Sequence, residues 1–140
     1  MLRDLGNMIA SQVTISPQTI GATGSASVDG VGVDRLGYES AVFVFNNSAV
    51  KAITTVPTGI TITCTVQESS DNSTFTAVSG YSEECVVTNT YTQTEIEVAD
   101  LKGFKRYVRG YMSYGSVGGS GDFIVVSATV VLGSPTEYPV

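Results

Sequence analysis

The segment Ile60-Thr-Ile-Thr-Cys-Thr-Val-Gln67 decides the fold class, because its apolar and polar side chains alternate strictly. The four residues at even positions are apolar and would point to one side of an extended chain, while the four polar residues at odd positions would point to the other. A period of two is typical of a β-strand with one buried face. The predicted inward residues are Ile60, Ile62, Cys64 and Val66.

The segment Phe123–Leu132 shows the same alternation, but its second face is also partly apolar. One face carries Ile124, Val126, Ala128, Val130 and Leu132, and the other carries Phe123, Val125, Ser127, Thr129 and Val131. This pattern predicts a central or interface strand that is covered on both sides. The continuous apolar run Ala41–Phe45 predicts another buried strand.

The composition favours strands throughout the chain. Val occurs 20 times and Thr 17 times, whereas Leu occurs 5 times, and 15 Gly residues punctuate the sequence as turns would. Eight or nine short strands without a convincing helix predict a single-domain, all-β, antiparallel β-sandwich, either jelly-roll or Ig-like. The further candidate strands are 12–15, 25–31, 75–78, 85–90, 92–98 and 105–114.

The candidate strand 105–114 has two possible orientations. Either Val108, Gly110 and Met112 face the core, or the alternate residues do, and we predict the former. The alternate residues Tyr107, Arg109 and Tyr111 then form a surface row. Tyr and Arg are enriched where proteins bind one another.

The two ends of the chain are predicted to be extended arms. We expect an N-terminal arm over 1–10, the sandwich over 11–133, and a C-terminal tail over 134–140 whose two prolines prevent a helix. Leu2, Leu5 and Tyr138 are the candidate contact residues of these arms. The Gly-rich stretches 21–32 and 115–121 predict mobile loops, and 101–104 predicts one helical turn.

The missing residue types exclude most catalysts. The 140-residue chain has no His, and its two cysteines cannot form a four-thiolate zinc site, so we expect no enzyme, no metal and no cofactor. The remaining acid–base candidates are two carboxylate pairs, Glu83 with Glu84 and Glu95 with Glu97, which are spacings that any acidic chain shows by chance.

The charge and the hydropathy of the chain limit the classes of partner that it is expected to bind. The net charge of −6 argues against a nucleic acid, and no apolar run reaches the roughly 18 residues that would span a membrane. We recognise no export signal, so Cys64 and Cys85 are expected to be reduced thiols. Seven acids and no base lie between residues 68 and 100, and four bases follow between 102 and 109. This pattern indicates either solvated faces or patches that pair between copies of the chain.

The segment Gln67–Phe75 predicts a hairpin turn at Asp71-Asn72, because Asp and Asn side chains bond to their own backbone and tolerate left-handed geometry. A calcium or sugar loop is the alternative, but Glu68, Asp71 and Asn72 lack the spacing of a calcium site. The glycosylation sequons at Asn46 and Asn72 are expected to be chance matches.

Four segments, in their order along the chain, resemble small tailed-bacteriophage virion proteins. They are Leu36–Val44, Thr65–Phe75, Leu101–Arg109 and Val126–Gly133, and Asn72 stands where Gly often follows the Asp of the hairpin. Many proteins of that group are similar to capsid decoration (cement) proteins, which bridge neighbouring capsomers and have no catalytic residues.

The resemblance implies a decoration protein that binds the major capsid protein on the virion surface after synthesis in the bacterial cytoplasm. We expect a homo-oligomer, with a trimer favoured because several arms multiply modest contacts. The alternatives are a carbohydrate-binding module of a tail or adsorption structure, which would use exposed Tyr81, Tyr91 and Tyr114, and a head–tail connector or tail-tube subunit. The expected contact residues are the arms with Lys105, Arg106, Tyr107, Arg109 and Tyr111.

Overall fold

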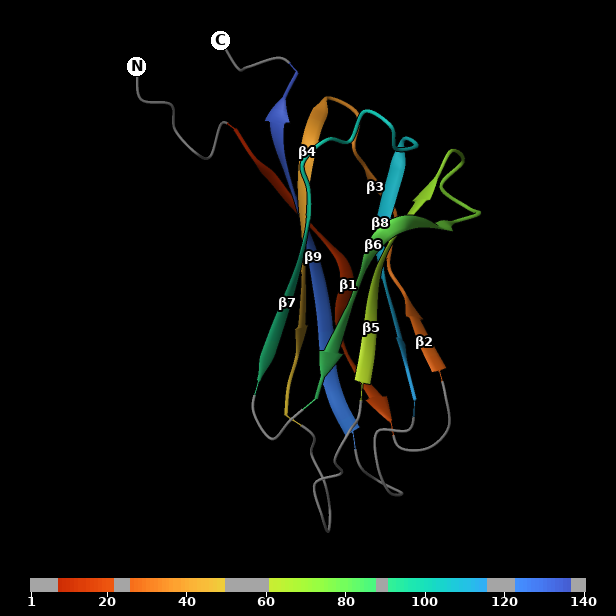
Figure 1. The fold of residues 1–140 in the computed structure, drawn as a ribbon, viewed down its shortest axis with the longest axis vertical. Coiled ribbons are helices and arrows are strands. Elements are labelled where there is room, and N and C mark those ends of the chain that lie inside the picture. Colours follow the sequence, from red (N-terminus) through yellow and green to blue (C-terminus); the bar gives the residue numbers. More distant parts are fainter. Residues whose placement is uncertain (1–7, 22–25, 50–60, 88–90, 116–122, 137–140) are drawn as a thin grey trace.

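The computed structural model describes residues 8–21, 26–49, 61–87, 91–115 and 123–136, and within these ranges the chain forms strands and turns only. The predicted all-β sandwich is therefore confirmed. Two antiparallel sheets pack face to face (Figure 1). The strands are β1 (Ala10–Gly21), β2 (Ala26–Asp29), β3 (Val33–Asp34), β4 (Tyr38–Asn47), β5 (Thr61–Ser69), β6 (Thr76–Val86), β7 (Thr92–Val98), β8 (Tyr107–Tyr114) and β9 (Phe123–Pro135).

The strand order identifies the sandwich as a jelly roll. One sheet has the order β1-β9-β4-β7, and the other has the order β2-β8-β5-β6 with β3 also beside β8. We count β2 and β3 as one interrupted strand. The first strand, β1, then pairs with the last, β9, and β2/β3 pairs with β8. In the same way β4 pairs with β7, and β5 pairs with β6 as a hairpin. This is a long hairpin rolled into two sheets, as in a jelly roll. An Ig-like sheet would instead pair its first two strands.

The predicted inward faces form the core between the sheets. Ile62, Cys64 and Val66 of β5 are buried, as are the even-numbered residues of β9 from Ile124 to Leu132. In β8 the inward residues are Val108, Gly110 and Met112, so the predicted orientation is confirmed. Phe43 and Phe45 of β4 are the largest fully buried side chains.

Several element boundaries differ from the predicted ones. The candidate 75–78 and the start of the candidate 85–90 belong to one strand, because β6 continues through a bulge at which Ala77 to Ser82 lie opposite Gln67 to Thr65 of β5. Residues 88–90 lie outside the described residues. Gly80 adopts a φ of +88° in this bulge, a conformation that other residues rarely adopt. The predicted loop 21–32 is wrong in part, since it contains β2.

The ends of the sandwich also differ slightly from expectation. Strand β1 begins at Ala10, inside the predicted arm, and β9 continues to Pro135, inside the predicted tail. The predicted helical turn at 101–104 is a single hydrogen-bonded turn, in which the Phe104 N–H donates to the Leu101 carbonyl over 2.9 Å. Most of the predicted loop 115–121 lies outside the described residues.

Cys64 and Cys85 are both buried and are not joined by a disulfide. Burial, together with the nearby Cys85 and Glu83, raises the pKa of the Cys64 thiol to about 12. The Cys85 thiol donates to the Asn47 Oδ1 atom over 3.3 Å. Because a thiol with a raised pKa carries little thiolate at neutral pH, Cys64 acts as a small core residue.

Candidate interaction surfaces

The predicted Tyr-Arg-Tyr row lies on the outer face of β8. Tyr107, Arg109 and Tyr111 are half-buried and alternate with the buried residues of the same strand. Tyr111 lies between Asp29 of β2 and Thr65 of β5 in the strand register. We call Tyr107, Arg109 and Tyr111 the tyrosine face.

Arg109 is held by the surrounding chain instead of projecting into solvent. Its Nε atom donates to the Gln67 Oε1 atom over 2.7 Å, and its Nη2 atom donates to the Asp29 carboxylate over 3.2 Å. The guanidinium lies 4.2 Å from the centre of the Phe75 ring, and only 16% of the side chain is exposed. Arg109 therefore offers a rigid flat surface whose charge is already paired.

The side chains of Arg106 and Lys102 are also paired within the chain, whereas Lys105 forms its hydrogen bond to Glu68 through its backbone. Arg106 forms a bidentate pair with Asp34, with a shortest distance of 2.8 Å, and lies over the ring of Tyr107. Hydrogen bonding from Arg106 holds the pKa of Asp34 below its ordinary value. Lys102 lies 3.8 Å from Glu39, and the backbone N–H of Lys105 donates to Glu68.

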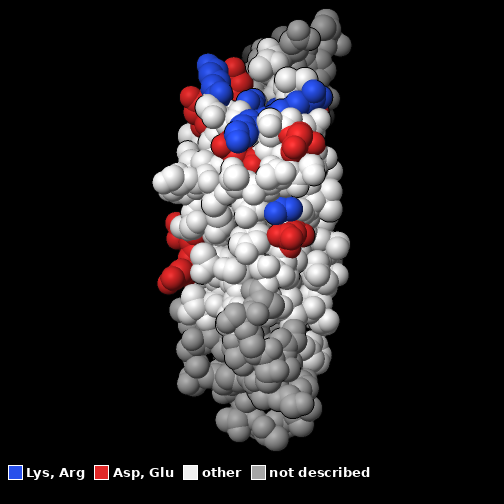
Figure 2. All heavy atoms as spheres, turned by 90° about the vertical axis from the view of Figure 1, so that its right-hand side faces the viewer, with Lys and Arg blue, Asp and Glu red and all other residues white. Residues whose placement is uncertain are grey.

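These pairings bear on the two interpretations of the charge pattern. In the view of Figure 2 the Lys and Arg side chains gather toward one end of the molecule, and acidic side chains lie beside them. Three of the four bases between 102 and 109 thus have acidic partners in their own chain. This arrangement favours solvated surfaces whose charges are paired within the chain over charged patches that pair with a second copy.

The predicted arm residues Leu2, Leu5 and Tyr138 lie outside the described residues. The other predicted contact residues lie close together: the tyrosine face is on β8, and Lys105 and Arg106 directly precede this strand. The roles of the arms stay predictions.

A second surface, which the sequence analysis did not single out, covers the outer face of the β1-β9-β4-β7 sheet. In one row across the strands Val13, Thr129, Val44 and Glu95 lie side by side, and in the next row Ser11, Val131, Val42 and Glu97 do. Val13 is 50% exposed, although valine side chains are usually buried. We call Ile9, Val13, Val42, Val44 and Val131 the valine face.

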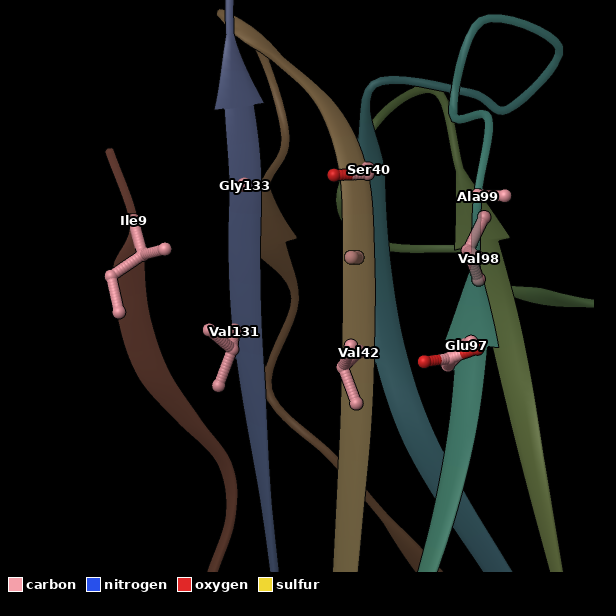
Figure 3. Close-up of a pocket in the computed structure, with 9 residues that line it drawn as sticks. Ile9, Ser40, Val42, Glu97, Val98, Ala99, Val131 and Gly133 are labelled. Carbon is pink, nitrogen blue, oxygen red and sulfur yellow. The ribbon is translucent and has the colours of Figure 1, made fainter. Parts of the chain in front are cut away.

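The valine face is hollowed at one end, where four strands each contribute a residue. Ile9 of the β1 side, Val131 of β9, Val42 of β4 and Glu97 of β7 surround a pocket of about 310 Å³ (Figure 3). Most of its lining is aliphatic, and Glu97 supplies a carboxylate at the rim. Such a hollow suits an apolar side chain of a partner better than a polar small molecule.

The sequence did carry a signal for this surface. The residues of Ala41–Phe45 are apolar at both parities, and Phe123–Leu132 has a second apolar face, so both strands were expected to be covered on both sides. The topology places β9 and β4 side by side in the middle of one sheet. Their second faces therefore join into a continuous surface that no described part of the chain covers.

The two predicted carboxylate pairs lie at exposed positions of β6 and β7. Glu83, Glu84, Glu95 and Glu97 are all exposed. Among the described residues no group of three or more His, Cys, Asp or Glu side chains could hold a metal ion. The same residues contain no helix that is long and apolar enough to cross a membrane.

The predicted turn at Asp71-Asn72 is confirmed and is built around one carboxylate. The Asp71 Oδ1 atom accepts from the backbone N–H groups of Thr74 and Ser73, each over 2.9 Å, and from the Ser69 hydroxyl over 2.7 Å. Asn72 has a φ of +58°, the left-handed geometry expected of it. The N–H of Thr74, the Ser69 hydroxyl and the N–H of Ser73 lower the pKa of Asp71 to about 2.

The low pKa of Asp71 predicts a pH-dependent effect of the substitution Asp71→Asn. Because the folded-state pKa lies below the ordinary value of 3.8, the ionised carboxylate stabilises the fold above about pH 4, and this contribution is lost as the pH falls toward 2. We expect the variant to melt at a lower temperature than wild type at pH 6 and the difference to shrink by pH 2. Melting curves followed by circular dichroism test this, and a difference independent of pH would contradict it.

Comparison with known proteins gives a fold relationship. No protein-family model matches the chain, and a search of curated proteins finds no match. Among solved structures, the chain is similar to PBSX exported protein XepA, with a TM-score of 0.52 and 19% identity; the match covers 94% of this chain and 39% of that one. A structure of carbohydrate-binding modules from the β-sandwich superfamily has a TM-score of 0.45 and 10% identity, covering 98% of this chain and 58% of that one. The chain therefore shares a β-sandwich fold with a protein of which it spans about two-fifths.

Proposed function

We propose that this chain is a non-enzymatic structural protein of a bacteriophage virion, a decoration protein that binds the outer capsid surface and stabilises the head shell. The resemblance of the four sequence segments to phage virion proteins supports this role. The structural neighbour PBSX exported protein XepA shares the β-sandwich fold, which is compatible with this role. The protein would be made in the bacterial cytoplasm and would act on the virion.

The observation that carries the proposal is the valine face. An antiparallel sheet in a sandwich normally presents polar side chains to water, whereas here Val13, Val42, Val44 and Val131 lie in two neighbouring rows across three adjacent strands. Permanent interfaces between identical subunits are more apolar than other protein surfaces. We assign the valine face to self-association, with a trimer as the expected assembly.

The tyrosine face supplies the contact with the major capsid protein. Tyr side chains bury a large area with little loss of conformational entropy, and Arg109 is already fixed by its neighbours before binding. An oligomer presents several copies of this face to the shell. Binding to several capsid sites at once multiplies the affinity of each modest contact.

Mixing the purified protein with undecorated heads tests this proposal. We expect saturable binding of a defined number of copies, measured by sedimentation and quantitative gel analysis. The double variant Tyr107→Ala/Tyr111→Ala should bind at least about tenfold more weakly per site, because buried tyrosines dominate many interfaces. The control Leu36→Ala removes an exposed apolar side chain from another place and should bind like wild type.

Two outcomes would count against the proposal. Binding that does not saturate would remove the capsid as the partner. Saturable binding that the double tyrosine variant retains in full would show that the tyrosine face is not the contact with the capsid. Light scattering and circular dichroism of each variant show that assembly and fold are intact, so a loss of binding is assigned to the contact itself.

A further inference from the structure

A second hollow lies at the opposite end of the sheet face that carries the valine face. Asn46 and Ser48 from the end of β4, Val125 and Ser127 from β9, and Tyr91 at the start of β7 line a space of about 180 Å³. Pockets for drug-sized ligands usually exceed roughly 300 Å³. This smaller, shallow hollow therefore suits a ligand the size of a single ring.

Tyr91 is an exposed aromatic residue whose side chain is held by hydrogen bonds. Its side chain is 61% exposed, yet its hydroxyl is hydrogen-bonded to the side chains of Asn46 and Gln93. Asn46 and Gln93 are opposite one another in the register of β4 and β7, one row further along the sheet than Tyr91. To reach them the tyrosine must lie along the sheet instead of standing away from it. One face of its ring is therefore turned toward solvent and held there.

The groups around this ring are planar or hydroxylated polar groups. The Gln93 Nε2 atom donates to the Glu95 carboxylate over 2.9 Å, which fixes the amide next to the tyrosine hydroxyl. The Ser48 hydroxyl accepts from the Val125 N–H over 3.0 Å and so joins β4 to β9 at the floor of the hollow. Among the described residues that line or border the hollow, Glu95 is the single charged group, and it is negative.

We propose that this hollow binds one ring of a neutral saccharide, with the apolar C–H face of the sugar stacked on Tyr91. A sugar ring has one face of C–H groups and a rim of hydroxyls, which matches an exposed aromatic face bordered by amides and hydroxyls. Acidic sugars would be repelled by Glu95. The proposal goes beyond capsid decoration and does not depend on it.

The saccharide site and the valine face can be occupied together. Asn46 follows Val44 by two residues along β4, and Ser48, which lies beside Tyr91 in the hollow, follows Val44 by four residues, which is about 14 Å at strand spacing. The intervening row of Asn46, Ser127 and Gln93 is polar. Self-association through the valine face would then leave Tyr91 open, and an oligomer would present several saccharide sites to a glycan-covered surface.

The test uses the full-length protein on an array of immobilised neutral and acidic glycans, which detects weak binding through multivalent display. We expect retention on neutral glycans only. Retained glycans are then titrated in solution and followed by NMR. Tyr91→Ala should weaken binding roughly tenfold or more. Tyr91→Phe keeps the ring but loses its hydroxyl anchors, and should weaken binding less than Tyr91→Ala.

The control Leu36→Ala removes another exposed side chain and should bind like wild type. Three results would overturn the proposal: no retention on any glycan, retention on acidic glycans alone, or equal binding by wild type and Tyr91→Ala. Circular dichroism of Tyr91→Ala shows whether the variant is folded, and Tyr91→Phe provides the second reading if it is not. Head binding by Tyr91→Ala should be unchanged, which separates this site from the capsid contact.

Discussion

Replacement of Thr14 by valine is expected to lower the free energy of unfolding by about 2–4 kcal/mol, although the two side chains have nearly the same shape. Thr14 is buried in β1, where its hydroxyl donates to the Val31 carbonyl over 2.8 Å and accepts from the Gly110 N–H over 3.0 Å. These two bonds join β1 of one sheet to the loop after β2 and to β8 of the other sheet. Valine would leave a buried backbone N–H without a partner.

The residues around Thr14 are packed too closely to move and compensate for the lost hydrogen bonds. The backbone of Gly30 runs so close that a Cβ atom there would lie 2.4 Å from both the Gly110 carbonyl oxygen and the Thr14 hydroxyl. Water therefore has no room to replace the lost hydroxyl. The same tight contact requires glycine at position 30.

Thr14→Ser is the matched control for this prediction. Serine keeps both hydrogen bonds and loses one methyl group, which costs about 1 kcal/mol. Urea denaturation of the three proteins should rank wild type above Thr14→Ser and Thr14→Ser above Thr14→Val. A valine variant as stable as the serine variant would show that these hydrogen bonds contribute little.

Local alternation explains why much of the fold could be predicted from the sequence. In Ile60–Gln67 and Phe123–Leu132 each side chain is assigned to a face by its parity alone, and the described residues assigned to the inner face are all buried. Thr65, which was assigned to the outer face, is buried as well. The hairpin at Asp71-Asn72 was predictable for the same reason, because its chemistry lies within a few adjacent residues.

Contacts between distant segments could not be predicted. Arg106 and Asp34 are 72 positions apart, and Gly110 and Thr14 are 96 apart. The pairing of these groups depends on which strands become neighbours, and strand alternation does not determine this. For that reason the run of bases at 102–109 left solvated faces and patches that pair between copies as alternatives, whereas the structure pairs Lys102, Arg106 and Arg109 within the chain.

The candidate surfaces differ in the same respect: one follows from a single strand, and the others depend on which strands are neighbours. The tyrosine face follows from the parity of one strand, so it was visible in Tyr107, Arg109 and Tyr111. The valine face needs β1, β9 and β4 to be adjacent, and Tyr91 needs Asn46 and Gln93 beside it. Each of these surfaces joins residues from strands that are far apart in the chain.

Replacement of Val42 by lysine is expected to dissociate the oligomer while the monomer stays folded. Val42 is part of the valine face and lies next to Val131 on β9 and Glu97 on β7. A lysine there can pair with Glu97 in the monomer, as cross-strand neighbours of opposite charge do. Self-association would bury that charge in an apolar interface, at a cost of at least about 3 kcal/mol for each interface, which weakens association by more than about a hundredfold.

Val42→Thr is the control, because threonine keeps the branched shape and adds no charge. Light scattering over a range of protein concentrations should give the oligomer mass for wild type and Val42→Thr, and the monomer mass for Val42→Lys. Since capsid binding depends on several linked contacts, the monomeric lysine variant should also lose most of its apparent affinity for undecorated heads, even though its tyrosine face is untouched. A lysine variant with the same mass as wild type would show that the valine face is not the surface through which the copies meet.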